Sequence, residues 1–503
     1  MATPNKPVIL SLTLSLAFTA ATLALAACGG GSGSSLSGSI PPPDQHHGSG
    51  STPIQHVIMI VQENRSFDDL FATFPGANGA TRGQEKLKKA GKYYRKWVTL
   101  KPTPLVIGYD LAHCRPSFLL DYDGGKMDGF NIPAATSCGP GPEAGTKPYQ
   151  YVTKSDIAPY WDIAEQWVLA DAMFQTQGSG SFTAHQDLIR GGTCIQACVH
   201  LSNSTETIVD NPTFWPWGCD APGPVVTHTV NVHGVEKENG PYPCSNKFPN
   251  YSGYQTLGTR LDSAGISWKY YTPCFSVTLQ PGCSPSSDCS GSKPNCNGSL
   301  LDAFDVIWPV RNSSEWGTKV SWPETNIFND ISNNALPAVS WVIPDDADSD
   351  HPNQPCGCDD GPSWVASVVN AVGQSSYWNS SVIVVVWDDW GGFYDNAVPP
   401  KQDKEGGLGF RVPMLVISPY AIAGSSSQGG YISHTQYEFG SLLKYIEENW
   451  NLPTLGTTDQ RATSIDDMLN YSQTPRQFKM IPSQHSAKFF MSRPHLVQHG
   501  DPD

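Results

Sequence analysis

The sequence predicts an α/β fold with a mostly parallel, doubly wound sheet. Residues 57–61 and 382–387 form short, continuous apolar runs rich in β-branched side chains, which is typical of parallel strands buried on both faces. Between these runs, further strand-like segments alternate with segments of helical periodicity. The chain of 503 residues is long enough to bury a large core around such a sheet.

The first residues indicate an export signal that is not part of the fold. Lys6 precedes an apolar stretch, and small residues lead up to Cys28, so residues 1–27 have the pattern of a secretory signal. The Leu-Ala-Ala-Cys ending resembles a bacterial lipobox, which predicts cleavage before Cys28 and lipidation of its thiol. An ordinary signal peptide or a single membrane anchor is the alternative. Residues 28–53, rich in Gly, Ser and Pro, then form a flexible tether.

Strand and helix signals begin directly after the tether. Residues 57–61 predict the first strand, and Ser66 is a suitable N-cap for the helix that follows. Residues 80–150 are polar and lack periodicity, so we expect irregular structure there. Residues 157–167 have apolar side chains at helical spacing, and a short strand is expected over residues 168–171.

The middle of the chain contains a turn, an insertion and a return to the α/β pattern. Residues 179–191 run from a Gly/Ser turn into a helix. Residues 200–300 are rich in cysteine and proline, which predicts a loop-rich insertion held by disulfides, with short strands such as residues 268–271. Residues 338–344 predict a strand that ends in two aspartates, and residues 361–375 predict a helix.

The last regular elements complete one large domain. Residues 382–387 and 412–418 predict two strands, and residues 437–450 predict an amphipathic helix. These elements place the boundaries of the domain at residues 54–452. Residues 453–503 are polar, and we expect them to wrap the surface as a C-terminal extension.

Charge and cysteine content exclude some classes of function. The net charge is −15, from 31 basic and 46 acidic side chains, so the chain lacks the basic character of a general nucleic-acid-binding protein. Of the 13 cysteines, Cys28 is assigned to the lipid anchor, and the remaining even number predicts disulfides in an exported protein. A zinc site at Cys283, Cys289 and Cys296 is the alternative, which the absence of any CxxC pair disfavours.

Oxygen-bearing side chains follow two of the predicted parallel strands. Glu63 and Asn64 come after the first strand, and Asp388 and Asp389 follow the strand at residues 382–387. Parallel strands present their carboxyl ends at the same edge of a sheet, where ligands bind in open α/β folds. We therefore expect one divalent metal ion at these four residues, because hard cations prefer oxygen ligands. A capping pair after one strand and a solvated end of the other are the alternatives.

Several motifs resemble the bacterial phosphoesterase family that contains phospholipases C and secreted acid phosphatases. The resemblance covers most of the chain after the tether, and the motifs that carry it lie at residues 56–68, 125–130, 349–352, 387–395 and 411–413. It implies an alkaline-phosphatase-like fold and a hydrolase that acts on phosphate esters. The insertion at residues 200–300 matches no known segment of the family.

The resemblance also places the nucleophile at Ser181, in the turn that enters a helix. A hydroxyl at a helix N-terminus lies beside free N–H groups that bind phosphate, and metal coordination would lower its pKa. The predicted metal ligands are thus Glu63, Asn64, Ser181, Asp388 and Asp389. Ser179 and Thr183 stay open as alternative nucleophiles, because the family often has proline where this chain has Thr183.

Three histidines match positions where the family needs proton donors or phosphate ligands. His351, in the Ser-Asp-His-Pro motif, is predicted to protonate the leaving oxygen. His113 is predicted to neutralise the phosphate oxygens, and His434, which precedes the last helix, matches a further family position. The alternative for each is a packed or solvated histidine without a catalytic part.

Together these expectations describe an exported, membrane-anchored lipoprotein, facing the periplasm or on the cell surface, that hydrolyses phosphate esters through a phosphoserine on Ser181. Its substrate is expected to be a small phosphomonoester or a phospholipid head group, with no nucleic acid. One alternative is a catalytically inactive surface lipoprotein that uses the same fold as a binding module. Sulfatase chemistry is disfavoured, because the chain lacks the Cys/Ser-x-Pro-x-Arg setting of the modified sulfatase nucleophile.

Overall fold

The computed structural model gives one compact unit over residues 45–503 that contains every described residue. The described residues are 52–135, 138–195, 206–213, 218–219, 225–231, 233–240, 254–273, 302–353, 358–400, 407–425 and 427–493. The predicted signal peptide, Cys28 and the tether up to residue 51 lie outside them. No helix in the described part of the chain is long and apolar enough to cross a membrane.

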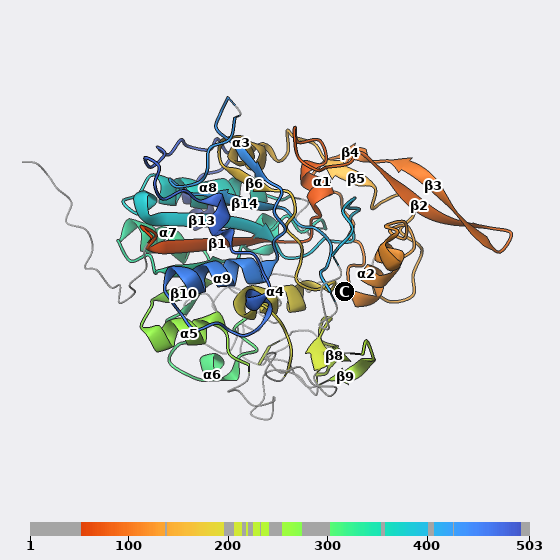
Figure 1. Ribbon diagram of the computed structural model, residues 1–503, viewed down its shortest axis with the longest axis horizontal. Coiled ribbons are helices and arrows are strands. Elements are labelled where there is room, and N and C mark those ends of the chain that lie inside the picture. Colours follow the sequence, from red (N-terminus) through yellow and green to blue (C-terminus); the bar gives the residue numbers. More distant parts are fainter. Residues whose placement is uncertain are drawn as a thin grey trace, which may run out of the picture. The chain divides into compact units, whose positions relative to one another are not determined.

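An eight-stranded sheet forms the centre of the unit (Figure 1). Its strands, in spatial order, are β11 (Val320–Ser321), β10 (Trp268–Tyr271), β12 (Val339–Val342), β1 (His56–Gln62), β13 (Ser381–Trp387), β14 (Met414–Ile417), β6 (Val168–Ala170) and β15 (Tyr431–Ser433). β14 runs antiparallel to both of its neighbours, and the other pairs are parallel. The mostly parallel sheet predicted from the sequence is therefore confirmed.

Helices cover both faces of this sheet, which explains why β1 and β13 are buried at every residue. In Figure 1, α3 and α8 lie on one face, and α4, α5 and α9 lie on the other. The helices are α1 (Phe67–Phe71), α2 (Arg115–Tyr122), α3 (Ala158–Gln166), α4 (Ser181–Arg190), α5 (Leu257–Ala264), α6 (Trp308–Arg311), α7 (Asn326–Ser332), α8 (Gly361–Gly373), α9 (Phe439–Asn449) and α10 (Ala487–Ser492). The predicted N-cap of α1 is present, because Ser66 Oγ accepts a hydrogen bond from the Asp69 amide.

Residues 80–150 are more regular than the sequence predicted. They contain an antiparallel hairpin of β2 (Arg82–Lys89) and β3 (Lys92–Thr99), strand β4 (Lys101–Thr103), helix α2 and, at their end, β5 (Gln150–Val152), which pairs with β4. The prediction failed because most of the hairpin is solvent-exposed on both faces. A ribbon without a buried face needs no apolar alternation, so the usual sequence signal of a strand is missing.

The expected insertion at residues 200–300 includes regular elements of the main fold. α5 and β10 belong to the central domain, and β10 pairs with β12 inside the main sheet. A separate small sheet holds β7 (Glu206–Ile208), β8 (Thr227–Asn231) and β9 (Glu236–Gly240). The predicted disulfides are present in part: Cys114 is bonded to Cys138, and Cys194, Cys219 and Cys358 are each disulfide-bonded.

The C-terminal extension contributes to the core as well as to the surface. Ile465, Met468, Ile481 and Phe490 are buried and pack into the main hydrophobic cluster. Between them the extension is polar and exposed, as predicted. These apolar residues are too sparse to form a periodic pattern, so their burial depends on contacts with α8, α9 and the sheet.

Candidate active site

The loops after three adjacent parallel strands, β12, β1 and β13, meet at one edge of the sheet. The Glu63 amide donates a hydrogen bond of 2.7 Å to the Ser349 carbonyl in the loop after β12. The Asn64 amide donates to Asp388 Oδ1 at 3.0 Å, which joins the loops after β1 and β13 across 324 positions of the chain. The predicted convergence of these two acidic strand ends is what the structure shows.

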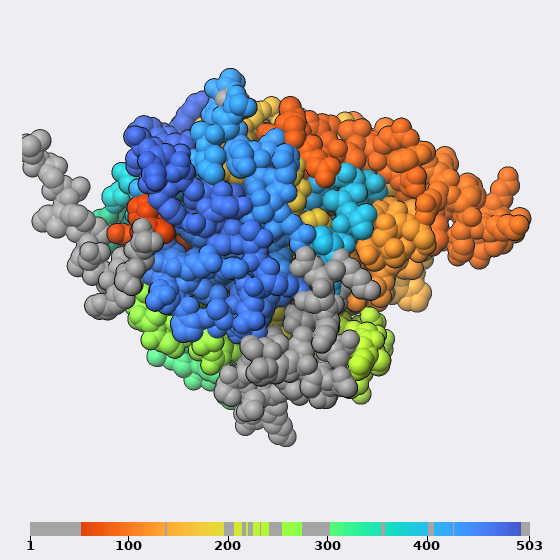
Figure 2. Space-filling model, in the orientation of Figure 1, coloured from red at the N-terminus to blue at the C-terminus, as the bar shows by residue number. Residues whose placement is uncertain are grey.

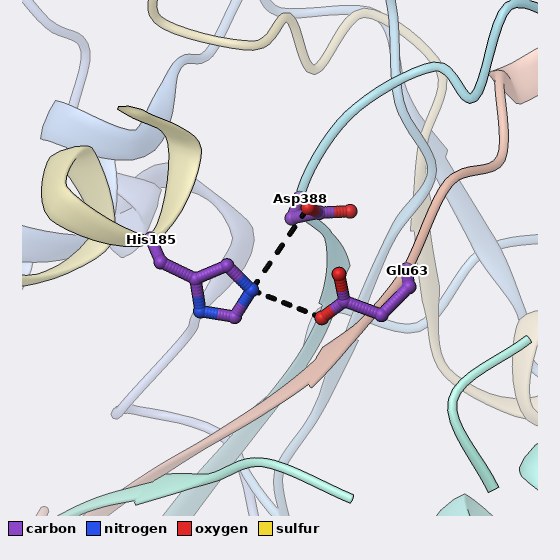
Figure 3. Close-up of side chains that lie close together, drawn as sticks. All are labelled: Glu63, His185 and Asp388. Carbon is purple, nitrogen blue, oxygen red and sulfur yellow. Dashed lines mark hydrogen bonds and ion pairs between the residues drawn. The ribbon is translucent and has the colours of Figure 1, made fainter. Parts of the chain in front are cut away.

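Glu63, His185 and Asp388 form a buried cluster with the donor atoms of a metal site (Figure 3). One donor atom from each residue lies within 4.8 Å of the other two. The His185 ring extends from α4 toward both carboxylates, and its Nε2 lies 2.9 Å from Glu63 Oε1 and 3.9 Å from Asp388 Oδ2. His185 was not among the predicted ligands. The available signal was its position four residues after Ser181, which places both residues on one face of the helix.

Burial and charge repulsion make this cluster unfavourable without a cation. Burial, together with the neighbouring Glu63 carboxylate, raises the pKa of Asp388 to about 8. Burial lowers the pKa of His185 to about 4, so its imidazole is neutral at pH 7. Two carboxylates and a neutral imidazole are the ligand types that divalent transition metals accept. The residues present therefore fit a divalent metal ion.

Ser181 lies at the first turn of α4, beside this cluster. Its Oγ is 3.2 Å from Asp389 Oδ2 and 3.4 Å from Asn64 Oδ1, so the hydroxyl can donate to either oxygen. The Gly391 amide donates to Asp389 Oδ1 at 2.7 Å, which holds this carboxylate with Oδ2 toward Ser181. Thr183, the alternative nucleophile, is buried, and its hydroxyl makes no hydrogen bond within the described residues. Ser181 is therefore the hydroxyl that contacts Asn64 and Asp389, and its role as the nucleophile stays a prediction.

Asn64 and His113 continue the hydrogen-bond chain away from Ser181. His113 Nδ1 lies 2.6 Å from the Leu111 carbonyl oxygen, which can only accept, so Nδ1 carries the hydrogen of this contact. Asn64 Nδ2 donates to His113 Nε2 at 3.2 Å, which leaves the amide oxygen facing Ser181. His113 Nε2 is also 3.9 Å from Asp389 Oδ2. The predicted residues Asn64, His113, Ser181 and Asp389 are thus brought together.

His351 lies on the loop after β12 that also accepts the Glu63 amide. Its Nε2 is 3.5 Å from Asp110 Oδ2, and Asp110 precedes His113 by three residues. The preceding residue, Asp350, has a left-handed backbone conformation with a φ of 70°. The Asp350 carboxylate accepts hydrogen bonds from the Tyr160 hydroxyl and the Trp387 indole. This loop therefore places His351 beside the segment that carries His113.

His434 has different surroundings from the other predicted residues. Its Nδ1 pairs with Asp171 Oδ2 at 2.8 Å, and its side chain is 65% exposed. It follows β15, which lies four places from β1 in the sheet, about 19 Å away at the usual strand spacing. The structure does not bring His434 together with Ser181, and its part in the reaction stays a prediction.

Two buried arginines hold the loops that carry the site. Arg65 donates to Asp69 and to the backbone carbonyl of Asp350, which ties the loop after β1 to the His351 loop. Arg411 forms hydrogen bonds from Nε and Nη2 to the carboxylate of Asp395, at the end of the loop that begins with Asp388. Both arginine side chains are fully buried, so the conformation of these loops is tightly constrained.

Comparisons with known proteins identify related sequences over most of the chain. The chain matches the model of the phosphoesterase family over residues 54–453. Phospholipase C A of Mycobacterium tuberculosis is 23% identical over 86% of this chain and 81% of its own length. Phospholipase C B of the same species is 25% identical over 91% of this chain and 86% of its own length. Non-hemolytic phospholipase C of Burkholderia pseudomallei is 24% identical over 79% of this chain and 55% of its own length.

Solved structures show weaker similarity. A protein in the alkaline phosphatase superfamily from Vibrio parahaemolyticus aligns over 83% of this chain and 74% of its own, with a TM-score of 0.33 and 8% identity. A TM-score this low does not establish a common fold. The fold class therefore depends on the sheet order and the helices on its two faces.

Proposed function

The chain belongs to the phosphoesterase family and hydrolyses phosphoric ester bonds, and we propose that it is an exported, metal-dependent enzyme that works through a phosphoserine on Ser181. The observation that carries this proposal is the buried Ser181 hydroxyl within hydrogen-bond distance of Asp389 and Asn64, next to the Glu63, His185 and Asp388 cluster. Several relatives are named phospholipases C, so we take phospholipids as the first substrate class, with acid-phosphatase activity on monoesters as the alternative.

In the first step, the Ser181 oxygen attacks phosphorus and the ester oxygen departs. The Ser181 proton passes to a neighbouring acceptor, for which Asp389 Oδ2 is best placed. Asn64 lies beside the same oxygen, and Ser181 is the first residue of α4, where the helix dipole favours negative charge. Glu63, Asp388 and His185, with Asn64 and Asp389 nearby, would hold a divalent cation, which would supply positive charge to neutralise the phosphate.

His351 is the proposed donor of the proton that the departing alcohol needs. The Asp110 carboxylate orients its ring, and the loop after β12 is hydrogen-bonded to the Glu63 amide, so the donor and the cluster share one framework. In the second step, water gives a proton to the same histidine and its oxygen attacks the phosphoserine. The Ser181 oxygen departs and takes back its proton from Asp389, and phosphate or a phosphorylated head group is released.

Export and membrane anchoring through Cys28 are part of the proposal. The disulfide between Cys114 and Cys138 supports an oxidising compartment outside the cytoplasm, since reducing conditions keep thiols free. An inactive binding module is disfavoured, because neither packing nor solubility requires two buried carboxylates, an imidazole and a serine hydroxyl at one point of the fold.

A nucleophile-replacement experiment tests this proposal. We expect Ser181→Ala to lower kcat on p-nitrophenyl phosphate and on phosphatidylcholine by roughly 10³-fold or more, because the covalent step is lost. Thr183→Val, which removes a neighbouring buried hydroxyl of similar size, keeps most of the activity. Acid-quenched wild-type enzyme shows one added phosphate by intact mass, and Ser181→Ala shows none. An added phosphate on the Ser181→Ala variant would reject Ser181 as the nucleophile. So would loss of the added phosphate in the Thr183→Val variant alone.

A further inference from the structure

The hairpin of β2 and β3 carries an unusual amount of positive charge for this acidic protein. Residues 82–99 contain seven Lys or Arg and one Glu, a net charge of +6, whereas the whole chain has a net charge of −15. The ribbon projects from the rest of the described unit (Figure 1), and its outer part stands clear of other elements in Figure 2. Lys88, Lys89 and Lys92, near its tip, form no ion pair within the described residues. This charge is therefore available to a partner.

Three large aromatic side chains are exposed on the same ribbon. Tyr93 is 60% exposed, Tyr94 is 45% exposed and Trp97 is 55% exposed. The register pairs Lys88 with Tyr93 and Leu87 with Tyr94, so successive tyrosines point to opposite faces of the ribbon. Aromatic rings with a polar edge beside lysines are the side chains that proteins place at the boundary between lipid and water. The tip of the hairpin thus presents a tyrosine ring on each of its two faces.

The base of the hairpin is anchored firmly next to the active-site loops. Leu100 is buried, Val98 is partly buried, and both pack in a cluster with Phe130 and Trp390, the residue directly after Asp389. Gly83 packs directly against the Tyr394 ring, because a Cβ atom added to this glycine would lie only 2.7 Å from the ring carbons. The hairpin is therefore held by the loop that follows β13 rather than attached by a flexible linker.

We propose that the β2–β3 hairpin docks the protein onto an anionic phospholipid surface. The lysines near the tip attract negatively charged head groups, each by about 1 kcal/mol near the surface. Tyr93 and Tyr94, next to the turn, then enter the interfacial region, where amphipathic rings are favoured. This role goes beyond the catalytic proposal and does not depend on it, because none of these side chains belongs to the metal cluster or the nucleophile.

The arrangement fits a lipid surface better than a nucleic acid. Proteins that bind single strands stack bases on aromatic rings along one groove or sheet face. Here Tyr93 and Tyr94 lie on opposite faces of a narrow ribbon near its end, so a nucleic-acid strand on one face would leave the ring on the other face unused. A lipid surface receives the whole tip at once, and rings on both faces become buried together.

Vesicle sedimentation with the full chain tests the proposal. We expect the wild type to bind vesicles of a roughly 7:3 mixture of phosphatidylcholine and phosphatidylglycerol at least about tenfold more tightly than vesicles of phosphatidylcholine alone. Lys89→Glu with Lys92→Glu is expected to weaken binding to the anionic vesicles by at least about tenfold. Tyr93→Ser with Tyr94→Ser is expected to weaken binding without a change of charge. Any contribution of the N-terminal segment is equal in all variants, and the neutral vesicles measure it.

The matched control is Lys479→Glu with Lys488→Glu, which changes the net charge of the chain by the same amount at two other exposed lysines. Retained binding in this control supports the hairpin as the docking element. Equal losses in both charge variants, no preference for anionic vesicles, or binding of a single-stranded oligonucleotide in place of vesicles would overturn it. Hydrolysis of p-nitrophenyl phosphate should stay unchanged in every hairpin variant, and its loss would show that the hairpin has a structural role instead.

Discussion

At the scale of a single residue, the backbone conformation and contacts of Asn64 explain why the motif after β1 has an amide side chain at this position. Its φ of 56° is in the left-handed region, which asparagine tolerates better than most residues. In that conformation its backbone amide reaches Asp388 and its side chain lies between His113 and Ser181. One residue therefore joins both strand-end loops, orients the imidazole and contacts the nucleophile.

Gly391 faces the backbone of Asn64 and allows the two loops to touch. Its φ is 58°, and a Cβ atom would lie 2.1 Å from the Asn64 carbonyl oxygen. We therefore expect Gly391→Ala to lower the free energy of unfolding by at least about 2 kcal/mol, from backbone strain and overlap. It should also nearly abolish hydrolysis of p-nitrophenyl phosphate, because the loops must separate. The measurements are urea denaturation and steady-state kinetics.

Gly108→Ala is the matched control for this prediction. Its φ of 67° is similar, but a Cβ atom would meet no atom within 4 Å. This variant should lose only about 1–2 kcal/mol from backbone strain and keep its activity. Equal activity in the Gly391→Ala and Gly108→Ala variants would show that close contact between the two loops is unimportant for the reaction.

Helix α4 acts as a single element that supplies both a nucleophile and a metal donor. Its first residue, Ser181, and His185 one turn later lie on the same face, toward the ends of β1 and β13. Gly180 precedes the helix at a point where a Cβ atom would lie 2.8 Å from the Asn211 side chain. The absence of a side chain at Gly180 thus allows the start of α4 to pack closely against the segment that contains Asn211.

Helix α9 contains a buried carboxyl group that makes stability depend on pH. Glu447 is 3% exposed, and its Oε1 accepts a hydrogen bond from the Leu455 amide at 2.8 Å. Burial and the neighbouring Asp459 raise its pKa to about 8. The folded state therefore holds the proton more tightly than the unfolded state, and the stability that Glu447 contributes below about pH 4.5 is lost as the pH rises through about 8.

Glu447→Gln should remove this pH dependence while keeping the hydrogen bond to Leu455. We expect the unfolding free energy of the variant, relative to that of the wild type, to increase by on the order of 2 kcal/mol between pH 5 and pH 9. Urea denaturation at the two pH values measures it. Glu448→Gln, at the exposed neighbouring position on α9, is the control and should show no such change. A pH-independent difference for Glu447→Gln would contradict the raised pKa.

At the scale of the whole molecule, the site and the stability of the fold are coupled through the central sheet. Glu63 follows β1, Asp388 follows β13, and these strands are neighbours in the centre of the sheet. Two buried carboxylates held this close repel each other, so the fold stores unfavourable electrostatic energy that a bound cation relieves. Metal binding and global stability should therefore change together.

This coupling predicts that Asp388→Asn has opposite effects on protein stability with and without bound metal. After treatment with a chelator at pH 9, Asp388→Asn should be at least as stable as the wild type, because one buried charge is gone and the hydrogen bond from the Asn64 amide can remain. Added Mn²⁺ or Zn²⁺ should stabilise only the wild type, by about 2.7 kcal/mol at a hundredfold excess over Kd. Thermal unfolding followed by circular dichroism measures both. Equal stabilisation of the two proteins would place the ion elsewhere.

Much of this fold and site is local in sequence, and those parts were predictable. The strands β1, β12, β13 and β14 are continuous apolar runs because they are buried on both faces, and Glu63, Asn64, Asp388 and Asp389 directly follow two of them. Elements whose burial is not periodic were missed, namely the solvated β2–β3 hairpin and the core contacts of the C-terminal extension.

By itself, the sequence determined the main buried strands and helices, the acidic ends of two strands and the Gly/Ser turn that enters α4, because each depends on residues that are neighbours in the chain. Only the tertiary structure decided which strands are adjacent. That adjacency brings Asp388 to Asn64, places two carboxylates next to His185 and leaves His434 at the edge strand. The physical reason is that contacts between distant segments depend on how the sheet is ordered and covered, and no local pattern of residues specifies that order.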